Sequence, residues 1–379
     1  MAKIVHISSA HKRNELRIHL KQCNSLAAFG YDVYFIVADG QGDSKIGDVK
    51  ILDSGLPQGR FQRLLITPWR LLKRAMEIKG SVYHFHDPEL LLIALFLKKN
   101  NANVIYDSHE DVPRAIMSRD WISPWIRRLV SIFFEFFENF ISRRLTCVIG
   151  ATPFIAERFD RAGCKSLAIN NFPLSSEIRI ESTIREWNPS ICFLGGISRV
   201  RGVREIIIAL ESLSTRMVLA GPFDDDKTRL FLEQLPGWRN VDYKGNLARK
   251  EAVKIMKESM IGMICYLPEP NHINSYPNKL FEYMAAELPV IASNFPLWRK
   301  IIEEAACGVC VDPTNPSEIR QAIEQMINDP EGCRQMGKNG KKAVQDKYNW
   351  VSEEKKLFQL YSNLIASKNY AENINNRLS

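Results

Sequence analysis

The stretch Asn274–Ser293, NSYPNKLFEYMAAELPVIAS, predicts a loop, a helix and a buried strand in succession. We expect the helix to begin near Pro277, because a proline at the first helical position gives up an amide proton that would have no partner there. The apolar residues that follow recur at the spacing of one buried stripe: Leu280, Phe281, Met284, Ala285 and Leu288. The apolar run Pro289–Ser293 then predicts a short strand. A unit of this kind is typical of an α/β layer.

Three polar residues lie beside this stripe. Asn278, Lys279 and Glu282 are three or four positions apart, so they share one flank of the helix. The free amides of a helix N-terminus favour a phosphate, and a carboxylate one turn further along accepts hydrogen bonds from two neighbouring hydroxyls, as on a ribose. The alternative is that Lys279 and Glu282 form an ordinary surface ion pair.

The rest of the chain repeats the same alternation of strands and helices. Lys3–Ile7 predicts a strand, residues 13–29 a helix that ends at Gly30, and Asp32–Val37 a second strand. This βαβ opening implies a mostly parallel sheet. A length of 379 residues suggests two domains. A polar segment after Asn171 separates them, and the strand Ser190–Leu194 opens the second.

Composition and net charge limit the classes of partner that the protein can be expected to bind. Hydrophobic residues make up 45% and charged residues 25% of the chain, as in globular proteins, and the net charge of +8 favours an anionic partner. The sequence shows none of the common nucleic-acid motifs, so we expect a phosphate-bearing substrate or a membrane surface and no nucleic acid. The amino terminus, MAKIVHISS, enters a strand without the pattern of a signal peptide, which predicts a cytoplasmic location.

The eight cysteines mostly lie in apolar runs, where a reduced thiol behaves as a small hydrophobe. Cys307 and Cys310 form a C-x-x-C pattern, for which a metal or redox role is the alternative. The sequence has no second pair and no histidine near this pattern, which favours two buried thiols.

Polar residues directly follow two further predicted strands, Ser81–His86 and Val104–Tyr106. Ligands of open α/β sheets bind outside the carboxyl ends of the strands, so these residues are expected to share one rim. The rim would contain His11, His86, Asp87, Asp107, His109 and Glu110. The alternative is that the histidines only make hydrogen bonds in their loops.

The most aromatic segment, residues 121–145, reads WISPWIRRLVSIFFEFFENFISRRL. Its phenylalanines and arginine pairs are typical of a helix in a membrane interface, and its charges exclude a bilayer span. The alternative is a covering helix whose aromatic side packs on the sheet. A second basic and aromatic segment contains Arg60, Arg63, Trp69, Arg70, Lys73 and Arg74. If both segments share one face, attachment to an anionic leaflet is the better interpretation.

The loop GGISRVRG, residues 195–202, follows a predicted strand and precedes a helix. Glycines allow close backbone approach, and cations ahead of a helix favour a diphosphate. Strand, glycine pair and helix are also common architecture without any ligand.

The segment PNKLFEYMAAELPVIAS resembles the donor-site signature of retaining glycosyltransferases of family 4, and HFHDPELL with VIYDSHEDVP resembles the amino-terminal domain of polysaccharide-assembling bacterial members. The resemblance implies the GT-B fold, an α/β class with two Rossmann-like domains facing across a cleft. The domains would be residues 1–172 and 190–345, joined by a linker at 173–189. A helix at 346–379 would return to the amino-terminal domain.

The resemblance also assigns roles. Glu282 would bind the ribose of a nucleotide sugar, and His109 would lie beside the transferring sugar. These two are the expected catalytic residues. Asn274 stands in place of the family's first glutamate, and Arg201 in place of its lysine, while Gly196 stands where a second cation is usual. The expected donor-binding set is Gly196, Arg199, Arg201, Asn274, Tyr276, Asn278, Lys279 and Glu282, and the acceptor-side set is His11, His86, Asp87 and Glu110.

The implied activity is metal-independent, retaining transfer of a sugar from a UDP- or GDP-linked donor to a lipid-linked saccharide. O-antigen or capsule assembly at the inner face of the cytoplasmic membrane would be its setting, with no cofactor. A nucleotide-sugar 2-epimerase of the same fold is one alternative, with Asp107, Glu110 and Asp111 as candidate bases. A non-catalytic nucleotide-sugar-binding protein is the other.

Overall fold

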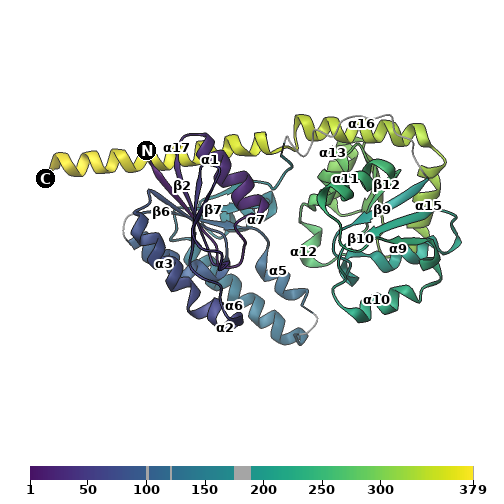
Figure 1. Cartoon of the computed structure of the whole chain (residues 1–379), viewed down its shortest axis with the longest axis horizontal. Coiled ribbons are helices and arrows are strands. Elements are labelled where there is room, and N and C mark those ends of the chain that lie inside the picture. Colours follow the sequence, from purple (N-terminus) through teal and green to yellow (C-terminus); the bar gives the residue numbers. More distant parts are fainter. Residues whose placement is uncertain (100–101, 120–121, 175–188, 379) are drawn as a thin grey trace. The chain divides into compact units, whose positions relative to one another are not determined.

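The chain forms two compact units, which are described separately (Figure 1). The computed structural model describes residues 1–99, 102–119, 122–174 and 189–378. The first unit consists of Met1–Asn171 and Trp350–Ser379, and the second of Phe172–Asn349. The predicted linker at 173–189 lies almost entirely outside the described residues.

The first unit contains an eight-stranded sheet in the order β3-β4-β2-β1-β5-β6-β7-β8. Strand β3 is antiparallel to β4, and the other neighbouring pairs are parallel. The strands are β1 (Lys3–Ile7), β2 (Asp32–Val37), β3 (Ser44–Ile46), β4 (Val49–Asp53), β5 (Val82–Phe85), β6 (Asn103–Ser108), β7 (Cys147–Gly150) and β8 (Ser166–Ala168). Because β1, β5 and β6 are adjacent and parallel, the residues that follow them meet at one edge of the sheet.

Helices cover this sheet, and one of them departs from the predicted geometry. Residues 13–29 were expected to form one α-helix; instead a π-helix, η1 (Leu16–Cys23), precedes the short α1 (Asn24–Ala28). The Glu15 side chain accepts a hydrogen bond from the amide of Ile18 and caps η1. The other helices are α2 (Gly59–Leu65), α3 (Thr67–Ile78), η2 (Pro88–Leu90), α4 (Leu91–Lys99), α5 (Val112–Met117), α6 (Pro124–Ser142), α7 (Pro153–Arg161) and α17 (Trp350–Leu378).

The second unit contains a six-stranded parallel sheet in the order β11-β10-β9-β12-β13-β14. Its strands are β9 (Ser190–Leu194), β10 (Arg216–Ala220), β11 (Val241–Tyr243), β12 (Ile261–Ile264), β13 (Val290–Ser293) and β14 (Gly308–Val311). Its helices are η3 (Arg199–Arg201), α9 (Val203–Ala209), η4 (Leu210–Ser212), α10 (Asp226–Glu233), η5 (Pro236–Asn240), α11 (Arg249–Glu258), α12 (Pro270–Ile273), α13 (Asn278–Ala285), α14 (Pro296–Ala305), α15 (Pro316–Ile327) and α16 (Pro330–Asp346).

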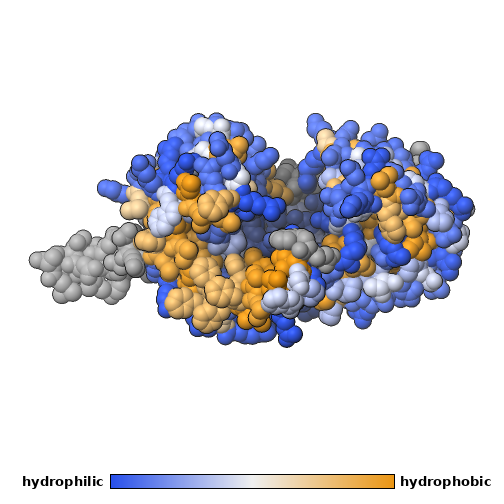
Figure 2. All heavy atoms as spheres, turned by 90° about the horizontal axis from the view of Figure 1, so that it is seen from below, coloured by the Kyte–Doolittle hydropathy of each residue, from blue (hydrophilic) through white to orange (hydrophobic). Residues whose placement is uncertain are grey.

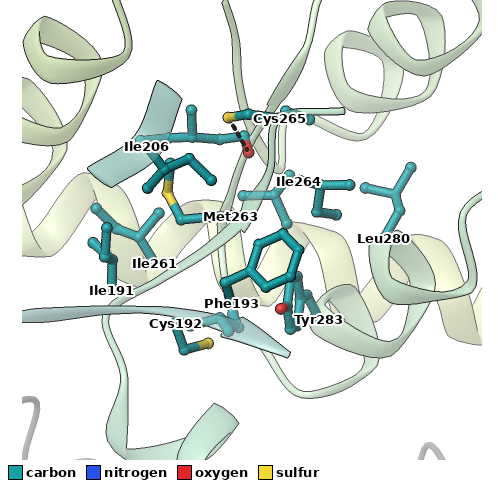
Figure 3. Packing of buried hydrophobic residues seen from close by; sticks show 14 of the residues in the cluster. Ile191, Cys192, Phe193, Ile206, Ile261, Met263, Ile264, Cys265, Leu280 and Tyr283 are labelled. Atoms are coloured by element: carbon teal, nitrogen blue, oxygen red, sulfur yellow. Dashed lines mark hydrogen bonds between the residues drawn. The ribbon is translucent and has the colours of Figure 1, made fainter. Parts of the chain in front are cut away.

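The core of the second unit fixes α13 against the sheet. Leu280, Phe281 and Met284 are buried, as the apolar stripe predicted. Tyr283 points into the same core beside Phe193 (Figure 3), and its hydroxyl accepts a hydrogen bond from the amide of Leu194 at 3.0 Å. Strand β9 therefore holds the helix that carries Lys279 and Glu282. Pro277 is the N-cap of α13 with an extended backbone, not its first helical residue as predicted.

Helix α17 belongs to the first unit although it follows the second in sequence (Figure 1). It begins at Trp350, whose indole nitrogen donates to the Ser25 hydroxyl at 2.8 Å. The buried carboxylate of Glu353 accepts from the amide of Asn170 at 2.9 Å. The predicted fold of two parallel-sheet α/β domains with a returning helix is confirmed. Within the described residues, no helix has the length and apolar character needed to cross a membrane.

Candidate functional site

A buried carboxylate, Asp107 at the end of β6, organises the polar side chains of the first unit. Arg17 donates from Nε to Oδ2 at 3.1 Å and from Nη2 to Oδ1 at 2.7 Å. Gln22 donates to Oδ2 at 2.8 Å. Burial opposes ionisation, yet the charge of Arg17 and the hydrogen bonds of His109 and His86 hold the pKa of Asp107 well below its usual range. Asp107 is therefore a stable anion inside the domain.

A chain of histidines extends from this carboxylate through the sheet. His86 Nδ1 and His109 Nε2 each lie 3.3 Å from Asp107 Oδ2 and 3.1 Å from one another. His86 Nε2 lies 2.9 Å from His6 Nδ1. His84 Nδ1 lies 2.7 Å from the hydroxyl of Tyr361 on α17. Burial lowers the pKa of His6 and His86 strongly and that of His84 to about 3, so these rings are neutral at neutral pH.

A second buried carboxylate, Asp87, shapes the loop after β1. Its Oδ2 accepts from the Ser8 hydroxyl at 2.7 Å and the Ser9 amide at 2.6 Å, and its Oδ1 lies 3.0 Å from His11 Nδ1. Burial opposes ionisation, but the hydrogen bond and charge of His11, with the serine donors, hold the pKa of Asp87 at about 2. The hydrogen bonds of Asp87 are therefore made to the loop after β1.

The rim predicted from strand ends is present, with different exposures among its members. His11 and His109 are partly exposed and their rings lie 5.0 Å apart. His86 and Asp87, expected on the acceptor side, are buried at 2% and 3% exposure and bond to other protein groups. Glu110 is exposed. Sequence reasoning missed His6, His84, Arg17, Gln22 and Tyr361, although the spacing of His84 and His86 in a strand does place both on one face.

Two sets of side chains among the described residues have the geometry to hold a metal ion: His6 with His84 and His86, and His86 with Asp107 and His109. In each set the candidate ligand atoms lie within 4.8 Å of one another. The predicted absence of a metal stays a prediction.

In the second unit, two cations converge on the glycine pair after β9. A Cβ atom on Gly195 would lie 3.1 Å from Arg201 Nη1 and 3.6 Å from Lys279 Cε. Gly202, between η3 and α9, has φ +67°, and a Cβ there would overlap the Cys265 carbonyl oxygen at 1.8 Å. Glycine is thus required at 202 for the turn that places Arg201.

The predicted flank of α13 carries a close ion pair. Lys279 Nζ donates to Glu282 Oε2 at 2.6 Å, with side-chain exposures of 26% and 18%. Asn278 is exposed at the start of α13, which has no side-chain cap. Asn274 is the C-cap of the short α12, and the Tyr276 ring packs against Phe281.

Arg199, predicted to bind the donor, donates instead to the carboxylate of Glu269 at 3.1 Å. Lys279 is therefore the second cation beside Arg201. Sequence reasoning missed two neighbours: Tyr266, whose ring centroid lies 5.4 Å from the Arg201 guanidinium carbon, and His272, whose ring lies 5.2 Å from that of Tyr266. Burial, followed by the charge of Arg201, lowers the pKa of His272.

Comparison with known proteins identifies both units at the level of domains. Residues 18–171 match the family described as "Glycosyl transferase 4-like domain", and residues 175–343 match "Glycosyl transferases group 1". A sucrose-phosphate synthase structure from Thermosynechococcus elongatus superposes with a TM-score of 0.77 at 18% identity, covering 97% of this chain and 100% of that one. The chain has the GT-B glycosyltransferase fold.

Further solved structures and curated sequences are also similar to this chain. A structure of HepE from Anabaena in complex with UDP superposes with a TM-score of 0.70 at 14% identity, over 96% of this chain and 100% of that one. Among curated sequences, the alpha-D-kanosaminyltransferase of Streptomyces kanamyceticus is 25% identical over 46% of this chain and 45% of its own length. The capsular polysaccharide biosynthesis glycosyltransferase CapM of Staphylococcus aureus is 24% identical over 46% of each chain. The chain thus spans about half the length of the curated relatives it matches.

The turn between α13 and β13 has a strained backbone at Glu287. This residue has φ +55°, a left-handed conformation that costs a non-glycine residue roughly 1 kcal/mol. Lys341 of α16 donates to Glu287 at 2.6 Å and offsets part of this cost. The turn between α13 and β13 keeps the geometry of a glycine turn without the glycine.

Proposed function

We propose that this protein is a retaining, metal-independent hexosyltransferase. It moves a sugar from a UDP- or GDP-linked donor to a lipid-linked saccharide acceptor in the assembly of a bacterial surface polysaccharide, O-antigen or capsule. The similarity to CapM supports the polysaccharide pathway, and the HepE complexes make UDP and UDP-glucose the first ligands to test.

The convergence of Arg201 and Lys279 on Gly195, beside Glu282, carries this proposal. A diphosphate needs cations and close backbone approach, and both are available at this turn. A carboxylate one helical turn away is placed to accept hydrogen bonds from two ribose hydroxyls. We assign the diphosphate to Arg201 and Lys279, and the ribose to Glu282.

In the proposed mechanism these two cations stabilise the charge that builds on the leaving diphosphate. They replace a metal ion at that position. His109 orients the transferring sugar, and the donor phosphate takes the proton of the attacking acceptor hydroxyl on the face from which it leaves. Retention at the anomeric carbon follows.

The test begins by measuring the midpoint of thermal unfolding in EDTA, with UDP, GDP or one of their sugar conjugates added. A nucleotide that binds raises the midpoint, and the corresponding sugar conjugate is then incubated with extracted lipid-linked saccharides. NMR of the product is expected to show the donor's anomeric configuration. An inverted product would refute retention, dependence on added metal would refute the role of the cations, and the lack of binding by all nucleotides would refute the donor site.

We also propose that the first unit binds an anionic membrane surface through one apolar face. Helices α2 and α3, α3 and α4, and α4 and α6 pack in succession, and the Trp69 and Phe96 rings lie 5.2 Å apart across α3 and α4. Large hydrophobic side chains are exposed on all four: Phe61, Leu64, Leu65, Trp69, Met76, Leu92, Phe96, Trp125, Ile126, Leu129, Val130, Ile132, Phe133, Phe136 and Phe140. Figure 2 shows the corresponding hydrophobic area on this unit.

The same helices and their ends carry exposed cations: Arg60, Arg70, Lys73, Arg128, Arg143 and Arg144. Apolar side chains surrounded by cations match an anionic lipid surface, where each basic residue adds about 1 kcal/mol. Phe133, Phe136 and Phe140 of α6 are exposed, whereas Phe137 packs against the core. The covering-helix alternative therefore accounts only for the buried side of α6, which also contains Ser131, Glu138 and Ile141.

Sedimentation with phosphatidylglycerol-containing vesicles tests this face. The double variant Phe133→Ser and Phe136→Ser removes side chains that are 72% and 70% exposed. Burying one phenylalanine is worth about 1.5–3 kcal/mol, so binding is expected to fall by about tenfold or more. The matched control is Leu230→Ser with Phe231→Ser on α10 of the second unit, exposed at 60% and 48%. Equal loss in both variants, or a concentration-dependent dimer without vesicle binding, would refute the proposal.

A further inference from the structure

The inner nitrogen of His109 faces two groups at once. His109 Nε2 lies 3.3 Å from Asp107 Oδ2 and 3.1 Å from His86 Nδ1. The carboxylate can only accept hydrogen bonds, because Arg17 and the other donors keep it ionised. Which nitrogen of His109 carries the proton is therefore decided by these neighbours.

Two proton arrangements of the chain protonate His109 Nε2. In the first, His109 Nε2–H and His86 Nδ1–H both donate to Asp107, and His6 Nδ1–H donates to His86 Nε2. In the second, His109 Nε2–H donates to His86 Nδ1, and His86 Nε2–H donates to His6 Nδ1. The remaining arrangement leaves Nε2 bare to accept from His86 Nδ1–H at 3.1 Å, and its lone pair then also faces the Asp107 carboxylate at 3.3 Å without a proton between them. Electrostatic repulsion inside a buried site disfavours that arrangement.

The donors around Asp107 favour a proton over a metal ion at this position. Asp107 Oδ2 already accepts from Arg17 Nε and Gln22 Nε2. A guanidinium is an obligate cationic donor, and a divalent ion on the same carboxylate oxygen would be repelled by it. A metal ion at Nε2 would also require that nitrogen to be bare.

We infer that Asp107 is a positioning residue for His109. It holds the ring with Nε2–H directed inward, and so leaves Nδ1 with a lone pair in the neutral ring. Nδ1 has no hydrogen-bond partner among the described residues, and the His109 side chain is 18% exposed. His109 thus accepts a hydrogen bond from a hydroxyl of the bound sugar. This inference rests on the proposed function, because that function gives the sugar to His109.

Histidine nitrogen NMR on the full chain with isotope-labelled histidine tests the tautomer directly. The His109→Gln variant assigns the signals of His109. At a pH where the ring is neutral, Nε2 is expected to be protonated and Nδ1 bare. A bare Nε2 with a protonated Nδ1 would overturn the inference, and so would a stoichiometric metal ion found by elemental analysis and shown to shift the Nε2 signal.

Kinetics of Asp107→Asn test the consequence. An amide cannot satisfy Arg17 and the two histidines together, so kcat is expected to fall by about tenfold or more. UDP binding is expected to change by less than about twofold, because the nucleotide is assigned to the second unit. A kcat within about twofold of wild type overturns the inference. If Asp107→Asn does not fold, the tautomer measured in the wild-type protein decides. If the wild-type protein binds none of UDP, GDP and their sugar conjugates, the proposed function is refuted instead.

Discussion

Replacing Glu282 by Gln separates the two interpretations of the α13 flank. If Glu282 holds the ribose, two charge-assisted hydrogen bonds worth roughly 1.5–3 kcal/mol each become neutral bonds of about half that strength. The loss of roughly 1.5–3 kcal/mol raises the dissociation constant of UDP by about 10- to 150-fold. If Glu282 only neutralises Lys279, its removal frees a cation and UDP binds more tightly.

The expected loss of UDP affinity is large enough to be measured in a thermal shift assay. UDP at about a hundred times its dissociation constant stabilises the wild-type protein by roughly 2.7 kcal/mol. The same concentration stabilises Glu282→Gln by only about 0.3–1.4 kcal/mol. For a unit of this size each kcal/mol moves the midpoint by about 2–4 °C, so a wild-type shift of about 5–11 °C falls to about half or less.

Two controls make the result specific. Glu287→Gln removes a carboxylate from an ion pair of the same length, 2.6 Å to Lys341, and is expected to keep the full UDP shift. Inorganic pyrophosphate lacks a ribose, so its shift is expected to survive in Glu282→Gln. Without ligand, Glu282→Gln is expected to lower the free energy of unfolding by at most about 1 kcal/mol, because the ion pair of Glu282 with Lys279 is partly exposed. An unchanged or larger UDP shift in Glu282→Gln would refute the ribose assignment.

Three further predictions follow from single contacts. Tyr361→Phe leaves buried His84 Nδ1 without its partner at 2.7 Å, and denaturant unfolding is expected to show a loss of about 1–3 kcal/mol in the free energy of unfolding. The control Tyr31→Phe removes a hydroxyl that lies 3.5 Å from Ser362 and is expected to lose much less; equal losses would contradict the prediction. Gly202→Ala, with its overlap at the Cys265 carbonyl, is expected to destabilise more than Gly245→Ala, which has φ +66° and open space; the same melting temperature for both would argue against it. Despite burial, the hydrogen bond to Asp87 raises the pKa of His11 above its usual 6.5, so the stabilisation from this pair is complete below that value and lost as pH rises through the folded pKa. The stability lost in His11→Gln should therefore be greater near pH 5.5 than near pH 9, and the opposite order would show that the sign is wrong.

The helix and strand at 278–293 were predictable because local rules agree there. The apolar stripe has helical spacing, and the strand that follows is a short apolar run. The exact start was missed, since a proline is compatible both with the N-cap and with the first helical position. The predicted polar flank was also correct in placement: Lys279 and Glu282 touch, as residues three apart on a helix do.

The histidine rim was predictable only as far as its strand ends. Parallel strands bring their following residues to one edge, which gave His86, Asp87, Asp107 and His109. The residues that bind Asp107 come from elements that no local sequence pattern predicts. Arg17 and Gln22 are five positions apart, which an α-helix places on different faces, whereas the i to i+5 hydrogen bonding of a π-helix stacks them on one face. Tyr361, which contacts His84 and not Asp107, comes from α17, far away in sequence.

The aromatic segment shows a different limit of sequence reasoning. Its composition fits both an exposed and a packed helix, because phenylalanine is equally suited to a core and to a membrane interface. The neighbours of the helix decide between the two. Tyr106 and Arg158 bind Glu138 of α6, and Arg114 binds Glu135. With these contacts made, Phe133, Phe136 and Phe140 are left exposed. Polar anchors to the domain interior therefore oriented this helix, against the usual expectation for an amphipathic helix.

Strand β6 connects the two proposals for the first unit. Its neighbouring residues Tyr106 and Asp107 point to opposite faces of the sheet. Tyr106 donates to Glu138 of α6 at 2.9 Å, and Asp107 holds His86 and His109. Both strand residues are buried, and close-packed interiors transmit displacement instead of absorbing it. A helix held by lipid would thereby fix the position of His109 relative to the bilayer, which is what transfer to an acceptor anchored in the same bilayer requires.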